Sequence, residues 1–395
     1  MVVAMRILTV CQFFESAHGG GIVVARLLRR LLEERGHRVD VLCLEGGDDP
    51  QPGTIYRLKA PPFLSRNLTR QFLLFLNNRY LDRWFTRQVD TLGFKAGSHD
   101  VIHCQDFLGV GIAQHLAALI GAQWGVTLHE FLPRRMSQTV SAAWLGRLLE
   151  TTCQWRDREL LSAYRSCTWL AGVSKAVSRS ASQFLETWHC RVETVYNAYT
   201  PQFLVPTSPI TRLDQSTRFL YVGRLSPEKG VDLLLDAFRQ LPGADTLTLI
   251  GLPGSLQRAA ERAAAADTRI RLSPPIRYEE MAAQYQAHDV VCCPARWEEP
   301  FGLTTLEARA CGRVVVGMRR GGIPEILEGY GRSILLEGTP GSRENTVIQL
   351  RDALLQARAL KSVELDEPFE RLFLRQFSGE SFLSSYERLY AMRRY

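Results

Sequence analysis

The sequence predicts an α/β protein made of two consecutive domains, each built around a parallel β-sheet. In both halves of the chain, short β-branched runs alternate with longer helical patterns. The alternation is interrupted once, by the proline-bearing polar stretch TPQFLVPTSPITRLD. A chain of 395 residues is also long enough to form two hydrophobic cores. We therefore expect a first domain over residues 1–199, a linker over 200–215 and a second domain over 216–375.

The expected strands are short apolar runs with β-branched residues, and the segments between them have helical periodicity. In the first half the strands are Arg6–Cys11, Val39–Leu44, Val101–Cys104, Gly125–His129, Thr168–Gly172 and Val192–Tyr196. In the second half they are Phe219–Val222, Thr246–Ile250, Ile270–Leu272, Val290–Cys293, Val314–Val316 and Ile334–Leu336. The main expected helices are Gly21–Glu34, Leu68–Leu92, Ala142–Ala163, Lys175–Thr187 and Leu303–Cys311.

Composition and charge narrow the class of protein. The net charge of +7 favours an anionic partner, without separating a nucleotide from a membrane surface or a nucleic acid. Nine scattered cysteines with no CxxC pair indicate reduced thiols in the hydrophobic core of a cytoplasmic protein. They indicate neither a disulfide framework nor a zinc site. The apolar N-terminal run is expected to be a first strand and not a signal peptide. No apolar run reaches about 18 residues, so we expect no membrane span.

The stretch YVGRLSPEKG places two cations in a loop between a strand and a helix. Arg224 and Lys229 flank this loop, and Gly230 stands at the expected start of the helix. An arginine and a lysine together can neutralise most of the charge of a diphosphate through charge-assisted hydrogen bonds. The alternative is that both side chains are solvated surface cations.

The stretch RWEEPFGLTTLEARACG places two glutamates eight positions apart, on either side of a Pro-Phe-Gly turn. The backbone N–H groups of Gly302, Leu303 and Thr304 open the expected helix, where the helix dipole favours an anion. Glu307, about one turn into the helix, can accept hydrogen bonds from the two vicinal hydroxyls of a ribose, and Glu299 can accept from sugar hydroxyls. The alternative is an acidic helix N-terminus stabilised by its own dipole.

These motifs, together with GGIPEI, resemble the carboxyl-terminal domain of glycosyltransferase family 4. The family consists of retaining enzymes of GT-B fold, in which two Rossmann-like, doubly wound domains face a central cleft. The resemblance implies that Arg224 and Lys229 hold the diphosphate of a sugar nucleotide, that Glu307 binds the ribose and that Glu299 binds the transferred sugar. The further nucleotide contacts that we expect are Gly223, Ile276 (whose backbone would meet the base), Phe301, Gly302, Leu303 and Thr304.

In the first half, the sequence HGGGIVV resembles the glycine loop of the family, in which the backbone of Gly20 and Gly21 approaches the donor phosphate and the acceptor. The alternative is a flexible turn. His129, at the end of VTLHEF, matches a histidine that contacts the donor sugar in the family, although a lone histidine at a strand end more often has a structural role. Gln105 departs from the pattern, because histidine is common at that position, which puts the acceptor contacts there in doubt.

Residues 65–89 mix arginines with aromatic residues along an expected helix. Such a pattern suits a membrane interface or an anionic acceptor groove, but we favour an amphipathic helix with an apolar face in the core and a solvated basic face. The end of the chain, 376–395, resembles the last helix of the family, which crosses back onto the first domain. There, Gly379 replaces an aromatic residue often found in the family.

The resemblance implies transfer of a sugar, with retention of anomeric configuration, from a nucleoside-diphosphate sugar to an acceptor hydroxyl. Arg224, Lys229, Glu299 and His129 are the expected catalytic residues, and neither a metal nor another cofactor is expected. Uridine diphosphate is favoured from its frequency in the family. A soluble small molecule or glycan is the favoured acceptor, a lipid-linked acceptor and peripheral membrane contact remain open, and nucleic acid is not expected. The alternatives are a GT-B sugar-nucleotide epimerase and a non-catalytic sugar-nucleotide-binding protein.

Overall fold

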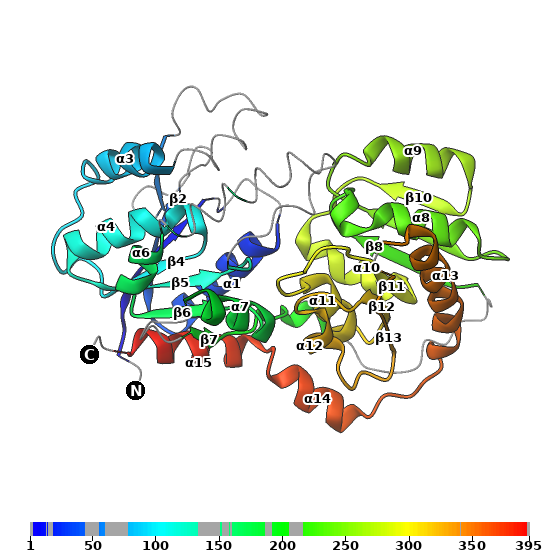
Figure 1. The fold of residues 1–395 in the computed structure, drawn as a ribbon. Helices are drawn as coiled ribbons and strands as arrows, with labels where there is room; N and C mark the ends of the chain where they lie inside the picture. Colours follow the sequence, from blue (N-terminus) through cyan, green and yellow to red (C-terminus); the bar gives the residue numbers. More distant parts are fainter. Residues whose placement is uncertain are drawn as a thin grey trace. The chain divides into compact units, whose positions relative to one another are not determined.

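The chain forms two compact units in the computed structural model (Figure 1). Unit 1 comprises Met1–Ala198 and Gly379–Tyr395, and unit 2 comprises Tyr199–Ser378. The structure describes residues 3–12, 14, 19–43, 55–59, 78–132, 151, 158, 160–185, 192–204, 216–339 and 341–392. Most of the stretch expected as a linker, 205–215, lies outside these residues.

The described strands of unit 1 form a seven-stranded parallel sheet in the order β3-β2-β1-β4-β5-β6-β7. The strands are almost continuously apolar because helices cover both faces of such a sheet. Their bounds are β1 Arg6–Cys11, β2 Arg38–Cys43, β3 Ile55–Arg57, β4 Val101–Cys104, β5 Gln123–Leu128, β6 Trp169–Gly172 and β7 Val192–Thr194. The helices are α1 Gly20–Glu34, α3 Asn78–Val89, α4 Val110–Ile120, α6 Leu161–Ser166, α7 Lys175–Leu185 and α15 Gly379–Tyr390.

The strands of unit 1 agree with the sequence prediction to within two residues at each end, with one addition. The short strand β3 was not predicted; it pairs with β2 at the edge of the sheet, and its three side chains are only partly buried. The first ten residues of the expected helix Leu68–Leu92 lie outside the described residues, and α3 forms most of the rest. The expected helix Ala142–Ala163 lies largely outside them, and α6 begins near its end.

The helix α3 has buried apolar side chains and two exposed arginines. The side chains of Phe85 and Val89 are buried, whereas those of Arg83 and Arg87 are exposed. The Trp84 indole N–H donates a hydrogen bond to the backbone oxygen of Lys59, at 2.8 Å. This arrangement is that of an amphipathic helix with a solvated basic face. In the residues that the structure describes, no helix is long and apolar enough to cross a membrane.

The last helix, α15, belongs to unit 1 and packs against α1 (Figure 1). A methyl group at Gly379 would lie 3.3 Å from the Leu31 side chain, so the glycine allows a close approach of the two helices. Arg35, at the end of α1, makes ion pairs with Glu380 and Glu387 of α15. The small residue that replaces the family's aromatic residue thus has a packing role.

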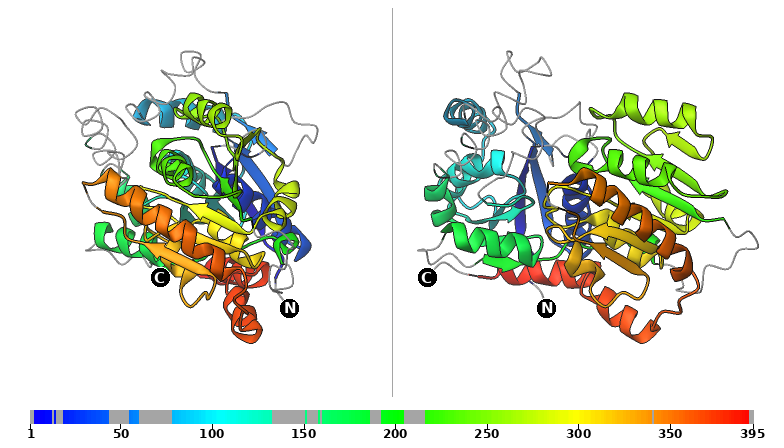
Figure 2. Two further views of the ribbon diagram at one scale, coloured as in Figure 1. Left: turned by 90° about the vertical axis from the view of Figure 1, so that its right-hand side faces the viewer. Right: turned by 45° about the vertical axis from the view of Figure 1, so that its right-hand side comes forward.

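The strands of unit 2 form a six-stranded parallel sheet in the order β10-β9-β8-β11-β12-β13. Helices α8 and α13 pack side by side, and α13, in orange, runs along the sheet in Figure 2. The strands are β8 Arg218–Val222, β9 Thr246–Ile250, β10 Ile270–Ser273, β11 Val290–Cys293, β12 Val314–Met318 and β13 Ser333–Leu336. The helices are α8 Val231–Arg239, α9 Gln257–Ala266, α10 Met281–Ala287, α11 Leu303–Ala310, α12 Ile323–Leu327, α13 Arg343–Leu360 and α14 Glu367–Arg375.

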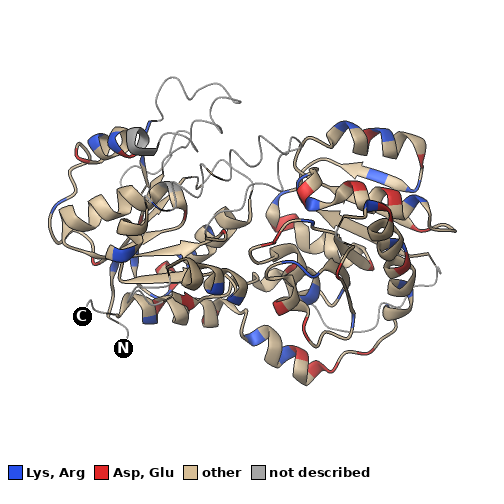
Figure 3. Ribbon diagram, viewed as in Figure 1, with Lys and Arg blue, Asp and Glu red and all other residues tan. Residues whose placement is uncertain are grey.

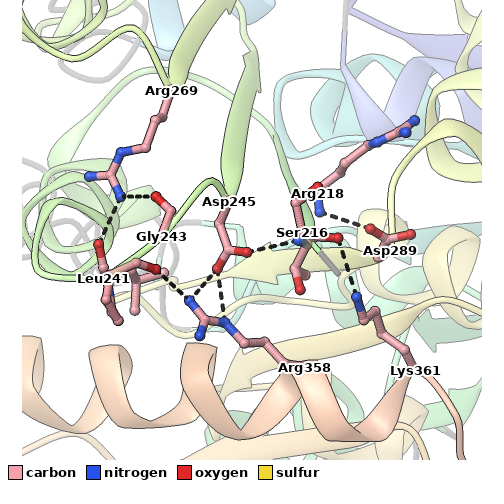
Figure 4. A network of polar contacts seen from close by, with 11 residues as sticks. Ser216, Arg218, Leu241, Gly243, Asp245, Arg269, Asp289, Arg358 and Lys361 are labelled. Atoms are coloured by element: carbon pink, nitrogen blue, oxygen red, sulfur yellow. Dashed lines mark hydrogen bonds and ion pairs between the residues drawn. The ribbon is translucent and has the colours of Figure 1, made fainter. Parts of the chain in front are cut away.

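The amino end of the unit 2 sheet is held by a network of polar contacts (Figure 4). The Asp245 carboxylate accepts hydrogen bonds from the Thr217 backbone N–H, at 2.8 Å, and from two guanidinium nitrogens of Arg358, at 2.5 and 2.9 Å. The Lys361 ammonium donates to the backbone oxygen of Ser216, at 3.4 Å. These contacts connect the end of α13 to the start of β8. The network therefore stabilises the amino ends of the strands, on the side of the sheet opposite to the loops that follow the strands.

Charged residues of both signs are interspersed on the helices of unit 2. Figure 3 shows this mixture along α9, α13 and α14, each of which carries both basic and acidic residues. The cysteines that the structure describes are free thiols, and all except the partly buried Cys293 are buried. The burial of these thiols agrees with the sequence prediction.

Candidate active site

The loop after β8 presents Arg224 at the carboxyl edge of the unit 2 sheet. The Tyr221 hydroxyl, at the end of β8, donates a hydrogen bond of 2.6 Å to the backbone oxygen of Arg224 and so fixes the loop. The Arg224 side chain is 62% exposed and lies 3.9 Å from the Glu228 carboxylate. Glu228 is also held by the Ser226 hydroxyl, at 2.5 Å. The backbone of Arg224 is therefore held by Tyr221, whereas its guanidinium group is open to solvent.

Gly230 allows this loop to turn into α8 against the end of β11. Its φ angle of 71° is in the left-handed region, which disfavours side chains. A Cβ atom at this position would lie 1.9 Å from the backbone oxygen of Pro294. The glycine at the expected start of the helix is thus required by both backbone conformation and space, and it brings Lys229 next to the loop that follows β11.

Lys229 lies in direct contact with Glu299, in the loop between β11 and α11. The lysine ammonium donates a 2.7 Å hydrogen bond to Oε2 of Glu299, and the Trp297 indole N–H donates to the same oxygen, also at 2.7 Å. The ammonium also lies 4.6 Å from the centre of the Trp297 ring, within the range of a cation–π interaction. A lysine has three donors, so two remain for an anionic ligand.

The segment GGIPEI holds the loop that carries Glu299. The N–H group of Gly322 donates to the backbone oxygen of Glu299, at 2.8 Å. The N–H group of Gly321 donates to the Glu298 carboxylate, at 2.7 Å. The three motifs that were singled out in the second half of the sequence, although separated by up to about a hundred positions, therefore meet at one edge of the sheet.

The amino end of α11 leaves backbone donors available. Gly302, which precedes the helix, has a φ angle of 99°, and no side chain caps it. Leu303 and Thr304 are the first two helical residues, and their N–H groups have no partner four residues back because the helix begins there. Phe301, also expected as a nucleotide contact, is buried, and its ring packs against Phe377 with centroids 6.1 Å apart.

Glu307 is a buried carboxylate held by two tyrosines. The Tyr278 hydroxyl donates to Oε1, at 3.0 Å, and the Tyr285 hydroxyl donates to Oε2, at 2.7 Å. Burial raises the pKa of Glu307 to about 7, and the two tyrosine hydrogen bonds oppose the rise. Each carboxylate oxygen keeps a second lone pair, so the group can still accept from two ligand hydroxyls. Ile276, partly buried, lies two residues before Tyr278 in the loop after β10.

We predict that Glu307→Gln stabilises the protein at alkaline pH. The folded protein raises the pKa of Glu307 from 4.5 to about 7, so this group's contribution to stability is complete below pH 4.5 and is lost as the pH rises through 7. Glutamine stays neutral, so the difference in free energy of unfolding should move by about 3 kcal/mol in favour of the variant between pH 4.5 and pH 8. Denaturant titrations at both pH values measure it, and a difference that does not change with pH would contradict the buried carboxylate.

In unit 1, His129 follows the end of β5 and lies beside the start of α1. A methyl group on Gly21 would lie 3.9 Å from Cγ and 4.0 Å from Nδ1 of the imidazole. Gly20 and Gly21 are the first two residues of α1 and are exposed. The Nε2 atom of His129 lies 3.0 Å from the amide oxygen of Gln105, which is buried. The glycines, His129 and Gln105 are thus neighbours.

Of the expected residues, the structure brings Lys229 and Glu299 together in unit 2 and Gly21 and His129 together in unit 1, and it adds residues that the sequence prediction missed. In unit 2 the additions are Trp297, Tyr278 and Tyr285. Trp297 was visible as an aromatic residue next to the two glutamates, but its contact with Lys229 depends on how two distant loops fold. In unit 1, Ser174 accepts a hydrogen bond from the Val177 N–H, at 3.1 Å, and so acts as a helix cap.

The two halves of the chain match two families of glycosyltransferases. Residues 18–203 match the family described as Glycosyltransferase Family 4, and residues 209–360 match the family described as Glycosyl transferases group 1. A D-inositol 3-phosphate glycosyltransferase of Mycobacteroides abscessus is 40% identical over 111 residues, which are 26% of this chain and 25% of that protein. The chain thus matches only about a quarter of the length of this relative.

Solved structures match nearly the whole chain. Sucrose-phosphate synthase from Thermosynechococcus elongatus has a TM-score of 0.72 at 19% identity, with 98% of both chains covered. HepE of Anabaena, solved in complex with UDP, has a TM-score of 0.68 at 16% identity, with 97% of this chain and 99% of that chain covered. At such identities the likeness establishes the fold. With both halves matched and two parallel-sheet units of Rossmann type, the chain belongs to glycosyltransferase family 4 and has the GT-B fold.

Proposed function

We propose that this protein transfers a sugar from a nucleoside-diphosphate sugar to an acceptor hydroxyl, with retention of anomeric configuration. The observation that carries the proposal is the grouping of Lys229, Glu299 and the amino end of α11 at one edge of the unit 2 sheet. This grouping offers an ammonium ion and free backbone N–H groups to an anion, beside a carboxylate that can accept from hydroxyls. A nucleoside diphosphate that bears a sugar has both of the groups that this arrangement can bind, an anionic diphosphate and sugar hydroxyls.

The proposed chemistry is stabilisation of the leaving diphosphate. As the bond to the anomeric carbon breaks, negative charge grows on the diphosphate, and Arg224, Lys229 and the N–H groups of Leu303 and Thr304 would stabilise it. Glu299 would hold the transferred sugar, and Glu307, fixed by its two tyrosines, would bind the ribose. His129, in unit 1, would contact a hydroxyl of the sugar. None of these steps assigns a role to a metal ion.

A uridine nucleotide is the donor that we propose, and the acceptor class stays open. HepE of Anabaena, which has the same fold, was solved with UDP, and this supports the choice of base. A soluble sugar or sugar-like acceptor fits the solvated basic face of α3 better than a lipid-linked one, since that helix buries its apolar residues Phe85 and Val89. Peripheral membrane contact through residues 65–89 stays a prediction.

Thermal-shift screening against uridine, guanosine and adenosine diphosphates tests the donor proposal. A ligand present at about 100 times its dissociation constant stabilises the folded protein by about 2.7 kcal/mol, which gives a clear shift of the melting temperature. We expect the largest shift with uridine diphosphate. Equal small shifts with all three would contradict a nucleotide site. Incubation with the donor alone then separates transfer from epimerisation, because an epimerase turns over without an acceptor.

We predict different effects for the two glutamates. Glu307→Gln should weaken binding of the bare diphosphate, because the ribose contact exists without any sugar. Glu299→Gln should leave that affinity nearly intact and lower turnover. Calorimetry with uridine diphosphate and an assay with the sugar nucleotide measure the two quantities.

Another glutamate of unit 2, Glu325, provides a control for that prediction. Glu325→Gln, in the short helix α12, removes the same charge outside the proposed contacts, so it should change neither quantity. If Glu299→Gln and Glu307→Gln lost diphosphate affinity equally, the proposed division of roles would be wrong.

A further inference from the structure

A cluster of buried polar residues surrounds His103 in unit 1. His103 of β4 makes two short contacts, from Nδ1 to the Tyr390 hydroxyl and from Nε2 to the Thr127 hydroxyl, both at 2.7 Å. The Tyr386 hydroxyl lies 2.8 Å from that of Thr127. Because Tyr386 and Tyr390 belong to α15, the last helix of the chain completes this cluster.

Gln105 connects this cluster to His129. It directly follows β4, is 4% exposed, and its amide nitrogen lies 3.2 and 3.4 Å from the two ring nitrogens of His103. Its amide oxygen lies 3.0 Å from Nε2 of His129. The two ends of a glutamine amide are not equivalent, because the nitrogen only donates and the oxygen only accepts. With the nitrogen directed at His103, the oxygen is left for His129.

An amide oxygen opposite Nε2 requires that Nε2 carry the proton. Burial lowers the pKa of His129 to about 4, so the imidazole is neutral near pH 7 and has one N–H group. If that proton is on Nε2, then Nδ1 has a free lone pair and is a hydrogen-bond acceptor. Nδ1 lies on the side of Gly21, and a methyl group added there would stay 4.0 Å away, so among the described residues this side of the ring has room for a ligand hydroxyl.

We propose that Gln105 is a positioning residue that fixes His129 as the Nε2–H tautomer, so that Nδ1 accepts a hydrogen bond from a hydroxyl group of the sugar substrate. The tautomer follows from the position of the Gln105 oxygen together with the neutral state of the buried imidazole, whereas the sugar ligand rests on the proposed function. A neutral acceptor nitrogen cannot pair with an anion. The group that meets His129 is therefore a hydroxyl, and a carboxylate at the same position of the sugar, as in a uronic acid, is disfavoured.

The departure of Gln105 from the family pattern then has a chemical consequence. A histidine at this position can either donate or accept toward His129 and can change its protonation state, so it leaves the tautomer undetermined. A glutamine held from the other side by His103 presents the oxygen only. With Gln105 in place of a histidine, this chain has one titratable group fewer at this position, and the amide oxygen of Gln105 is an acceptor at every pH.

Nuclear magnetic resonance of the full chain, labelled with ¹⁵N at histidine, tests the tautomer directly. At pH 7 we expect the His129 signals, assigned with His129→Gln, to show a protonated Nε2 and an unprotonated Nδ1. A protonated Nδ1, or protons on both nitrogens, would overturn the proposal. Because the tautomer is measured on the unaltered protein, the result does not depend on whether a variant of Gln105 folds.

Two leucine variants separate positioning from packing. Gln105→Leu removes the acceptor, and we expect the signals of both tautomers to appear. Gln114→Leu is the matched control: Gln114, on α4, donates to the Ser166 hydroxyl at 2.9 Å instead of contacting His129, so the variant should leave the His129 signals unchanged. If Gln105→Leu also left the His129 signals unchanged, Gln105 would not set the tautomer.

Turnover and binding distinguish failure of this inference from failure of the proposed function. With the sugar nucleotide, Gln105→Leu should lower turnover about tenfold, as expected for one neutral hydrogen bond, while the affinity for bare uridine diphosphate stays unchanged. Expected ¹⁵N signals without any binding of a sugar nucleotide would reject the proposed function and the hydroxyl contact but leave the tautomer established. Binding and turnover with the wrong tautomer would reject the role of Gln105 alone.

Discussion

Lys229→Ala is expected to lower turnover by roughly a hundredfold to a thousandfold, as is typical of the loss of one group that stabilises developing charge. The interaction strengthens as the diphosphate departs, so the loss should fall on turnover more than on substrate binding. The lysine is held in place by Glu299 and by the ring of Trp297 and is therefore oriented before the ligand arrives. Arg224→Ala should act in the same direction, and more weakly, because the Arg224 side chain is 62% exposed and its guanidinium lies 3.9 Å from Glu228, a longer contact than the 2.7 Å between Lys229 and Glu299.

A second lysine of unit 2 provides the control for this prediction. Lys361, at the amino end of the same sheet, contacts the backbone oxygen of Ser216 and lies outside the proposed site (Figure 4). Lys361→Ala removes the same charge and should leave turnover within about twofold of the unaltered protein, since surface substitutions usually have small effects. Steady-state assays with a sugar nucleotide compare the three variants. Near-normal rates for both Lys229→Ala and Arg224→Ala would show that the diphosphate binds elsewhere.

The sequence was sufficient to predict the architecture because the two sheets are buried on both faces. A strand such as Val290–Cys293, predicted with the correct bounds, is apolar throughout, and the sequence pattern alone marks it. The edge strand β3, Ile55–Arg57, has three residues that are only partly buried, so no pattern distinguishes it from a loop. Its pairing with β2 stabilises it, and pairing cannot be seen in a local pattern.

The candidate site was predictable where its residues are close in the chain and not where they are distant. Arg224 and Lys229 share one loop, and Glu299 and Glu307 flank one turn, so their motifs are visible in the sequence. The tyrosines that hold Glu307 come from positions 278 and 285, and neither is marked by a motif. Likewise, Gln105 was noticed only as a departure from the family, because its partner His129 lies 24 positions away.

A buried ion pair fixes the other end of α11, the helix whose amino end lies in the proposed site. The Arg309 guanidinium donates to both oxygens of Glu370, on α14, at 2.8 and 2.9 Å, and both side chains are almost completely buried. It also donates to the backbone oxygens of Ile326 and Glu328. Burial lowers the pKa of Arg309, and the pairing with Glu370 opposes this. The guanidinium lies 3.3 Å from the centre of the Phe373 ring, so it is enclosed on that side as well.

We predict that Glu370→Leu lowers the free energy of unfolding by about 3–5 kcal/mol, because it leaves a buried guanidinium without its counter-charge. The double variant Arg309→Met/Glu370→Leu should be less destabilised than the sum of the two single variants, since it removes both charges together. Arg371→Gln, also on α14, is the matched control: its ion pair with Glu367 is exposed, and its loss should cost less than about 1 kcal/mol. Denaturant titration of the four proteins measures these differences. A Glu370→Leu variant no less stable than Arg371→Gln would mean that the ion pair does not anchor α14 to α11. A loss of several kcal/mol confined to Glu370→Leu would instead show that the position of α11, and with it the N–H groups offered at Leu303 and Thr304, depends on a charge pair at its far end.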